Sequence, residues 1–414
     1  MNLALINIKQ LVTVAAQGEK AKRKAAMREI GVIENAAVIA EGDRVTWVGR
    51  MEDLPMANLK EAEVIDCIHN VVMPGFVDAH THLVYAGSRE GEFAMRSAGA
   101  TYEEIGNKGG GILSTVGAVR SSSKKDIKKN ARQTLLAMMK HGTTTVEIKS
   151  GYGLTFRDEI KMLEAIAELQ NEEVIGIVST FMGAHAYPPE YKERKGAYVD
   201  EIAMNMLPYV ASHKLAEFCD VFCERGYFDL EDAKRILSEG RRLGLKPKIH
   251  AEQLSASGSA QLAAELHAIS ADHLEHVTES GVAALSGSDT VAVVLPGVSF
   301  FLNEQYAPAR ALIDGGATVA IASDFNPGSC MSYDMPLMMT IACTHMKMTP
   351  EEAITSATLN AAAAIDRSHE LGSIEVGKKA DLVILNIPNY KFLAYHFGEN
   401  HVQKVIKDGV VLEV

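Results

Sequence analysis

Cysteine is scarce in this sequence: five of the 414 residues are cysteines, an odd number scattered along the chain. Disulfide-built proteins use many paired cysteines, so the scarcity excludes such a scaffold and favours free thiols in a reducing compartment. Cys219 and Cys223 have no second Cys or His pair at zinc-finger spacing, and we interpret them as small buried apolar side chains. We therefore expect a cytoplasmic protein. The five residues are Cys67, Cys219, Cys223, Cys330 and Cys343.

The chain also lacks any run of 18 or more apolar residues, and its first residues lack the pattern of a signal peptide. Positive charge is in deficit, because 41 Lys and Arg residues stand against 53 Asp and Glu residues, a formal net charge of -12. Phosphate backbones and anionic lipids repel such a chain. We expect neither a nucleic-acid partner nor a membrane partner.

From about residue 74 onward, short apolar runs alternate with amphipathic helical segments. Strand, helix and strand in repetition indicate parallel pairing, and nearly continuous apolar strands indicate burial on both faces. Eight such runs predict a (β/α)8 barrel. An open doubly wound sheet is the alternative, but it would place a Gly-rich phosphate loop after the first strand, where this chain has His-Thr-His. The predicted strands are 75–82, 144–150, 175–185, 219–224, 246–252, 268–274, 290–296 and 318–324.

The two chain ends differ from this middle part, since both contain short β runs with turns and little helix. They flank the barrel, so we expect them to form one small β-sandwich. The predicted domains are 1–72 together with 372–414, and a barrel over 73–371. Within the barrel, the stretch 98–123 is expected to be the longest loop.

The stretch "MPGFVDAHTHLVYAGSRE", residues 73–90, places two histidines one residue apart after an apolar run. In a strand, residues i and i+2 point to the same face, so His80 and His82 project together. Two neutral imidazoles side by side are able to hold one divalent metal. A pair of surface histidines at a strand end is the structural alternative, and H-x-H alone does not decide between the two.

Ionisable residues also end most of the other predicted strands. Catalytic residues of such barrels gather at the carboxyl ends of the strands. Any one of these residues has a purely structural explanation, for example an Asx turn at Asp324. Taken together, three histidines and one carboxylate are able to converge on one ion and leave a position for water, as in a catalytic zinc site. The strand-end residues are His80, His82, His185, Glu224, His250, His273 and Asp324.

The sequence resembles the amidohydrolase superfamily, and within it the imidazolonepropionases. The resemblance rests on "PGFVDAHTH", "GSRE", "HGTTTVEIKSGYGL", "GAHAYPPEY", "LAEFCDVFCERGYF", "SADHLEH" and "SDFNPGS", and it extends over nearly the whole chain. It implies hydrolysis of the ring amide of 4-imidazolone-5-propanoate to N-formimidoyl-L-glutamate in histidine degradation, by a metal-activated water. It further implies a homodimer and one metal ion, Zn or Fe, bound by His80, His82, His250 and Asp324.

The resemblance also assigns roles to residues around the metal. Asp324 would take the proton of water, and His273 would stabilise the oxyanion or help to move that proton. Arg89 matches the anchor of the propanoate, and Lys149 is interpreted as structural or as a charge behind the ligands. Further residues expected to bind substrate are Tyr152, His185, Gln253, Asn326, Gly328 and Ser329.

Gln253 departs from the pattern of the single-metal deaminases and of some imidazolonepropionases, which carry Glu three residues after the histidine of the fifth strand. Glutamine cannot give and recover a proton, so ring deamination is disfavoured. The donor to the leaving nitrogen stays open among Glu252, Asp324, His185 and His273. The alternatives are another single-metal amidohydrolase, such as a deaminase or a formimidoylglutamate deiminase, and a non-catalytic scaffold of this fold.

Overall fold

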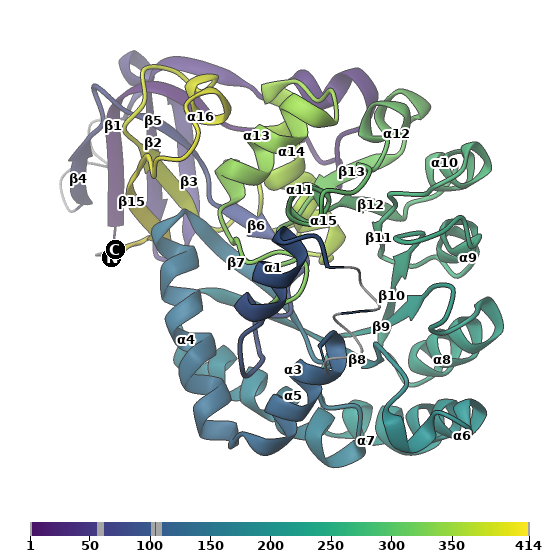
Figure 1. The fold of residues 1–414 in the computed structure, drawn as a ribbon. Coiled ribbons are helices and arrows are strands. Elements are labelled where there is room, and N and C mark those ends of the chain that lie inside the picture. The colour runs from purple at the N-terminus through teal and green to yellow at the C-terminus, as the bar shows by residue number, and fades with distance from the viewer. Residues whose placement is uncertain (1, 56–61, 101–103, 105–109, 413–414) are drawn as a thin grey trace.

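A computed structural model describes residues 2–55, 62–100, 104 and 110–412. Strands β6 to β13 are parallel and pair in sequence order, and helices surround them (Figure 1). The strands are β6 (Phe76–Asp78), β7 (Thr143–Lys149), β8 (Gly176–Ala184), β9 (Phe218–Cys223), β10 (Lys246–Ala251), β11 (Ser270–His273), β12 (Val291–Val294) and β13 (Thr318–Ile321). All eight predicted strands are present, and the predicted TIM-like barrel is confirmed.

The barrel closes between the segments that follow β6 and β13. Thr81 forms a parallel bridge with Phe325, Asp324 N donates to His80 O at 3.0 Å, and His82 N donates to Phe325 O at 3.0 Å. These bonds join the carboxyl ends of the first and last strands, as a closed barrel requires. They also place the His-Thr-His segment directly beside Asp324.

Helices connect the strands, and their starts follow ordinary capping rules. Ser123 and Thr155 accept hydrogen bonds from Asp126 N and Asp158 N, which satisfies donors in the first turns of α4 and α5. The helices are α1 (Glu90–Ser97), α3 (Ile112–Ser121), α4 (Lys124–Lys140), α5 (Phe156–Glu172), α6 (Lys195–Glu201), α7 (Leu207–Ser212), α8 (Leu230–Arg242), α9 (Ser259–Glu265), α10 (Glu279–Ser286), α11 (Pro296–Leu302), α12 (Ala309–Gly315), α13 (Met335–His345), α14 (Pro350–Ala357), α15 (Leu359–Ala364) and α16 (Phe392–Tyr395).

The expectation of one loop over 98–123 was wrong for its second half, because Ile112–Ser121 form helix α3. Val116 and Val119 are buried on one face of this helix. Their spacing of three residues is helical. The glycines before the helix and Gly117 within it concealed that periodicity in the sequence.

The two chain ends form one mixed sheet beside the barrel (Figure 1). Its order is β16-β15-β14-β5-β1-β2-β3, and β4 also pairs with β1. Alternate apolar residues of these strands, including Leu3, Val38, Ile384 and Ile406, form a core of their own. The strands are β1 (Asn2–Val12), β2 (Val32–Glu41), β3 (Arg44–Arg50), β4 (Ala62–Asp66), β5 (Val71–Pro74), β14 (Leu382–Leu385), β15 (Val402–Lys407) and β16 (Val410–Leu412).

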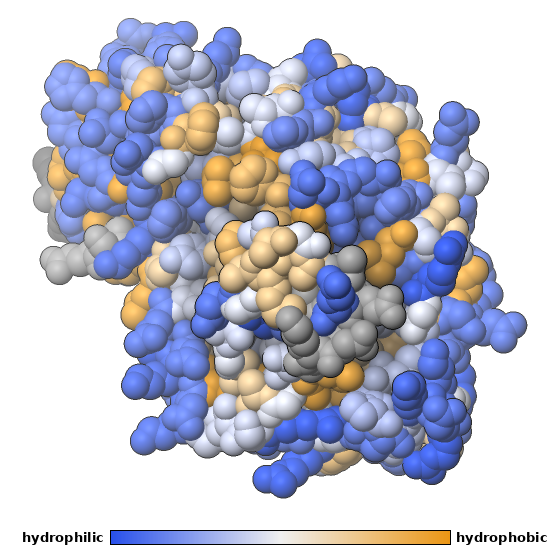
Figure 2. Space-filling view, in the orientation of Figure 1, coloured by the Kyte–Doolittle hydropathy of each residue, from blue (hydrophilic) through white to orange (hydrophobic). Residues whose placement is uncertain are grey.

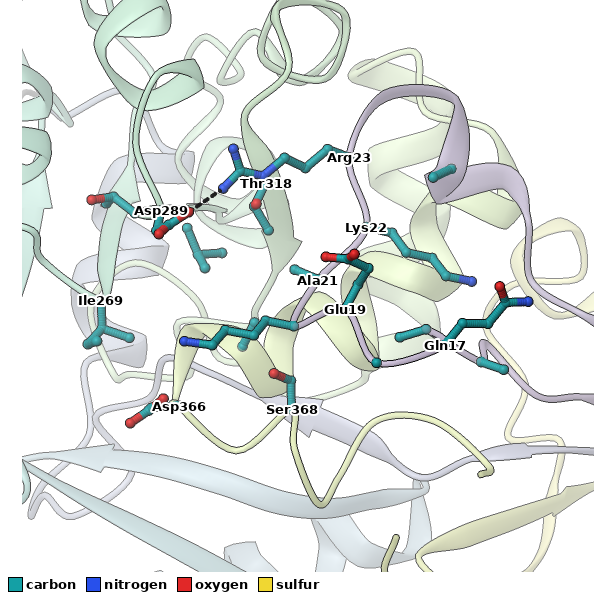
Figure 3. A pocket seen from close by; sticks show the side chains of 18 of the residues that line it. Gln17, Glu19, Ala21, Lys22, Arg23, Ile269, Asp289, Thr318, Asp366 and Ser368 are labelled. Carbon is teal, nitrogen blue, oxygen red and sulfur yellow. Dashed lines mark hydrogen bonds and ion pairs between the residues drawn. The ribbon is translucent and has the colours of Figure 1, made fainter. Parts of the chain in front are cut away.

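The segment after β1 runs past the amino ends of the last barrel strands. There it lines a cavity of about 1030 Å³, across which Arg23 and Asp289 form an ion pair of 3.1 Å (Figure 3). Ile269 and Thr318, at the starts of β11 and β13, lie on its wall. Residues at this end of a barrel generally contribute to stability, and catalytic residues are expected at the opposite end, where the strands terminate. No helix in the described part of the chain is long and apolar enough to cross a membrane.

Helix α14 is anchored by a buried carboxylate, and this yields a stability prediction. Glu352 Oε2 accepts from Thr349 N at 2.8 Å, Thr349 Oγ1 accepts from Glu352 N, and the same carboxylate pairs with Arg310 at 2.9 Å and Arg28 at 3.0 Å. We expect Glu352→Gln to lower the free energy of unfolding at pH 7 by about 2 kcal/mol, because the charge-assisted bonds with Arg310 and Arg28 become neutral ones, whereas glutamine keeps the capping box.

The effect of Glu352 should depend on pH. Burial raises the pKa of this carboxyl, but the bonds from Arg310, Thr349 and Arg28 lower it by a larger amount. Its pKa in the folded protein therefore lies below the usual value. Its stabilisation is therefore complete above about pH 4.3, the unfolded value, and is lost as the pH falls through the folded pKa. Urea midpoints at pH 7 and pH 4 measure this, with exposed Glu231→Gln in the first turn of α8 as control. If the difference in urea midpoint between the wild type and Glu352→Gln stays constant with pH, the Glu352 carboxylate is not the source of the stabilisation.

Candidate active site

Three buried histidines converge at the carboxyl end of the barrel. Ligand atoms of His80, His82 and His250 lie within 4.8 Å of one another, and so do those of His80, His273 and Asp324. His80 and His82 follow β6, whereas His250 is near the end of β10. Asp324 Oδ1 lies 3.5 Å from His80 Nε2 and 3.7 Å from His82 Nε2. The strands that the sequence pattern singled out therefore bring these residues together.

Hydrogen bonding behind the histidines leaves unpaired acceptors in the centre. His80 Nδ1 lies 2.6 Å from Asp272 Oδ2, so it carries the proton and Nε2 keeps its lone pair. His80 Nε2 and Asp324 Oδ1 are both buried and have no hydrogen-bond partner among the described residues. Two buried acceptors that face each other without a donor are costly unless a cation lies between them. Three imidazoles and one carboxylate are also a suitable donor set for such a metal ion.

Burial sets the charge state of the cluster. Desolvation lowers the pKa of His80 and His82 well below the usual value, and it lowers the pKa of His250 to about 3. All three imidazoles are therefore neutral near pH 7 and able to act as ligands. Burial raises the pKa of Asp324 to about 6, since it outweighs the stabilisation of the carboxylate by His273 and Asn326.

A cavity of about 420 Å³ opens onto this cluster and is lined by most of the predicted site residues. Helices α1 and α3 border the cavity and cross in front of the barrel in Figure 1. Apolar residues gather over α1 at the centre of the same face in Figure 2. Phe93 of α1 is stacked on Phe301 of α11, with ring centroids 5.2 Å apart. The predicted residues on the wall are His82, Arg89, Tyr152, His185, His250, Gln253, His273, Asp324, Asn326, Gly328 and Ser329.

Arg89 directly precedes α1, and its side chain forms part of the cavity wall. Its Nε and Nη2 donate to Glu92 Oε2 at 3.0 and 2.8 Å. A Cβ on Gly328 would lie 2.1 Å from Arg89 Nη1, so only glycine at 328 leaves room for the guanidinium. Asn326 shapes the same loop, because its Oδ1 accepts from Gly328 N and Ser329 N at 2.8 Å.

Aromatic and imidazole rings form another part of the wall. His185, after β8, stacks on His82 with ring centroids 4.8 Å apart, and Tyr152 lies 5.3 Å from His185. Burial lowers the pKa of His185 to about 4, so its ring is neutral near pH 7. Burial also lowers the pKa of His273, but Glu275, 3.6 Å from its Nδ1, together with Asp324 and Asp272 more than compensates, so the net pKa of His273 is raised.

The structure separates Gln253, which lines the cavity, from Glu252, which does not. The backbone at Glu252 is left-handed, with φ 51°. Its carboxylate turns toward the loop before α9, where Oε1 accepts from Gly258 N at 3.0 Å. His80 is also absent from the wall, because it is fully buried.

Sequence reasoning missed several charged residues of the site. Asp220, in the middle of β9, lies 3.1 Å from His250 Nδ1, and Asp272 of β11 holds His80. A charged residue inside an apolar strand is the signal that could have identified both, because a buried charge requires a partner. Arg96 and Glu304 also line the cavity, and Arg96 packs 4.9 Å above the Phe301 ring.

Comparisons with known proteins agree with this arrangement. The sequence profile of the amidohydrolase family matches residues 71–412. An imidazolonepropionase from Geobacillus sp. (strain WCH70) is 48% identical over 413 residues, which cover 99% of this chain and 97% of the relative. An imidazolonepropionase from Porphyromonas gingivalis (strain W83) is 48% identical over 414 residues, which cover 100% and 97%.

Solved structures support the same fold. Atrazine chlorohydrolase from Arthrobacter aurescens, complexed with zinc, matches with a TM-score of 0.76 at 16% identity, over 99% of this chain and 95% of that one. An adenosine deaminase from Xanthomonas campestris with bound zinc has a TM-score of 0.69 at 18% identity, over 99% and 92%. At these identities the two likenesses concern the fold, whereas the relatives and the profile identify the family. The chain therefore belongs to the amidohydrolase family and, within it, to the imidazolonepropionases.

Proposed function

We propose that this chain hydrolyses the ring amide of 4-imidazolone-5-propanoate to N-formimidoyl-L-glutamate, with one metal ion held by His80, His82, His250 and Asp324. The observation that carries the proposal is a single cavity whose wall includes both the ligand cluster and Arg89. The nearly full-length identity to imidazolonepropionases supports the choice of substrate. Zinc and iron both suit three imidazoles and a carboxylate, so the ion is one of the two. The expected homodimer stays a prediction.

The ligand residues are arranged to hold the ion and leave a side open to substrate. His80 lies behind, whereas His82, His250 and Asp324 border the cavity. When bound there, a metal ion polarises the substrate carbonyl and lowers the pKa of a coordinated water toward about 7. The surrounding protein orients the reacting groups and keeps bulk water away from them.

Asp324 and His273 are the residues placed to move the proton. Asp324 Oδ1 faces His80 Nε2 and the proposed metal position, which leaves Oδ2 to take the proton of the attacking water. Its Oδ2 lies 3.4 Å from Ser329 Oγ, which fixes the carboxylate plane. His273 faces the cavity with Glu275 behind its Nδ1, an arrangement that favours the protonated ring and suits an oxyanion donor. Glu252, turned into its own loop, is a weaker candidate for the donor to the leaving nitrogen.

The remaining wall residues fit the substrate. Arg89 offers a cation to the propanoate, and its fork is held by Glu92. Tyr152 and His185 provide flat surfaces and polar edges for the imidazolone ring. Gln253, Asn326, Gly328 and Ser329 supply amide and hydroxyl groups around the product.

The purified chain should consume 4-imidazolone-5-propanoate and release no ammonia. Loss of its ultraviolet absorbance and formation of N-formimidoyl-L-glutamate measure the reaction. Cytosine, guanine and N-formimidoyl-L-glutamate should release no ammonia even at high enzyme concentration, because Gln253 cannot shuttle the proton that deamination requires. Ammonia from any of these would favour a deaminase or a deiminase instead. A protein without turnover or stoichiometric metal would be the non-catalytic scaffold.

A further inference from the structure

A second layer of charge lies behind the histidines, on the strands rather than on the cavity wall. It consists of Glu147 and Lys149 of β7, Asp220 of β9, Lys248 of β10 and Asp272 of β11. All five side chains are buried, with 0–1% of each residue exposed. Buried charges are rare unless paired, so each must be explained by the groups that it contacts.

Lys149 is the centre of this layer. Its Nζ donates to Glu147 Oε1 at 2.7 Å and to Asp220 Oδ2 at 2.8 Å, and it lies 3.6 Å from Asp272 Oδ2. Burial alone would lower the pKa of Lys149, but Asp220, Glu147 and Asp272 together raise it above its usual value. The ammonium is therefore charged, and one cation contacts three carboxylates that come from three strands.

Two of those carboxylates reach the histidines directly. Asp272 Oδ2, near Lys149, lies 2.6 Å from His80 Nδ1. Asp220 Oδ2, bonded to Lys149, lies 3.1 Å from His250 Nδ1. A carboxylate at Nδ1 fixes both the tautomer and the orientation of an imidazole, so that Nε2 points at the metal. The positions of these two carboxylates in turn depend on what holds their oxygens.

We propose that Lys149 is a positioning residue of the metal site: it fixes Asp220 and Asp272, and through them it aims His250 and His80 at one ion. The inference rests on the metal site of the proposed function. It explains why a lysine occurs inside an apolar strand without reaching the cavity wall. Without Lys149, two adjacent anions would repel each other and the two imidazoles would lose their common orientation.

Lys407 offers a matched comparison outside the barrel. It is a buried lysine of β15, in the sheet formed by the chain ends, and its Nζ donates to Asp381 Oδ2 at 2.8 Å. Loss of Lys407 therefore removes a buried cation paired with a carboxylate but leaves every contact of Lys149 in place.

The test is the zinc affinity of the purified full-length chain, measured by competition with a chromogenic chelator. We expect Lys149→Met to weaken zinc binding by about 10- to 100-fold, the usual effect of removing a group behind the ligands. Cobalt(II) in place of zinc should show an altered absorption spectrum, which reports ligand geometry. Lys407→Met should lower the melting temperature but leave zinc affinity and the cobalt spectrum unchanged.

A second variant guards against misfolding. The double variant Glu147→Gln with Lys149→Met removes one charge of each sign and should fold, yet it should lose zinc affinity like the single variant. Wild-type affinity and spectrum in the double variant would overturn the inference and make Lys149 purely structural, as would equal losses in Lys149→Met and Lys407→Met. A wild-type chain that binds no zinc, cobalt or iron would instead refute the proposed metal site itself.

Discussion

His250→Ala should abolish turnover of 4-imidazolone-5-propanoate and empty or loosen the metal site. His250 Nε2 lies 3.4 Å from His82 Nε2, so the variant removes one of three imidazoles that share one centre. A bound metal contributes several kcal/mol of transition-state stabilisation, and each 1.4 kcal/mol is a factor of ten in rate. We therefore expect kcat/KM to fall by at least about 10³-fold. Asp324→Ala should behave in the same way.

Metal analysis of each variant accompanies the kinetics. His213→Ala is the matched control, because His213 is an exposed histidine that stacks on Tyr209 at the end of α7. It should keep the metal content and the rate of the wild type. Full metal occupancy with normal turnover in both His250→Ala and Asp324→Ala would refute the ligand assignment.

The barrel and its strand-end residues could be predicted from the sequence because both follow from local patterns. Apolar runs of strand length alternate with helical segments, and ionisable residues stand where most of these runs end. The rule that parallel strands present their carboxyl ends together then brings residues 82 and 324 into one site. The order and direction of the strands alone determine that these two residues lie close together.

Lys149 can be interpreted from the sequence as a charge behind the ligands, but the contacts among these charges could not be predicted in this way, because the partners are distant in sequence. Lys149 and Asp220 are 71 residues apart, and Asp272 and His80 are 192 apart. Only the register of β7, β9 and β11 decides which carboxylate meets which cation. The sequence also could not show that Gln253 lines the cavity whereas Glu252 does not. This difference depends on the left-handed backbone at Glu252, which the residue types do not reveal.

Arg89→Met should lower kcat/KM for 4-imidazolone-5-propanoate by about 10- to 1000-fold, with the fold and metal content unchanged. The propanoate does not react, so its anchor mainly provides binding and orientation. A charge-assisted pair contributes on the order of 1.5–3 kcal/mol, and more when its loss leaves a desolvated carboxylate unpaired. Glu92 already occupies Nε and Nη2, which leaves Nη1 beside Gly328 to meet the substrate. Lysine should restore only part of the activity, because its ammonium lacks the planar geometry with which Arg89 bonds Glu92 and reaches the substrate at the same time.

The substrate itself provides the sharper control. An analogue without the carboxylate has nothing for Arg89 to bind, so the effect of Arg89→Met should largely vanish on it. Arg235→Met, which removes an exposed arginine paired with Asp200 on the outer surface, should leave both rates unchanged. Equal losses on the substrate and on the analogue would show that Arg89 supports the packing of α1 against the 326–329 loop. The propanoate anchor would then have to be another cation of the wall, and Arg96, 4.9 Å above the Phe301 ring, would be the next to test.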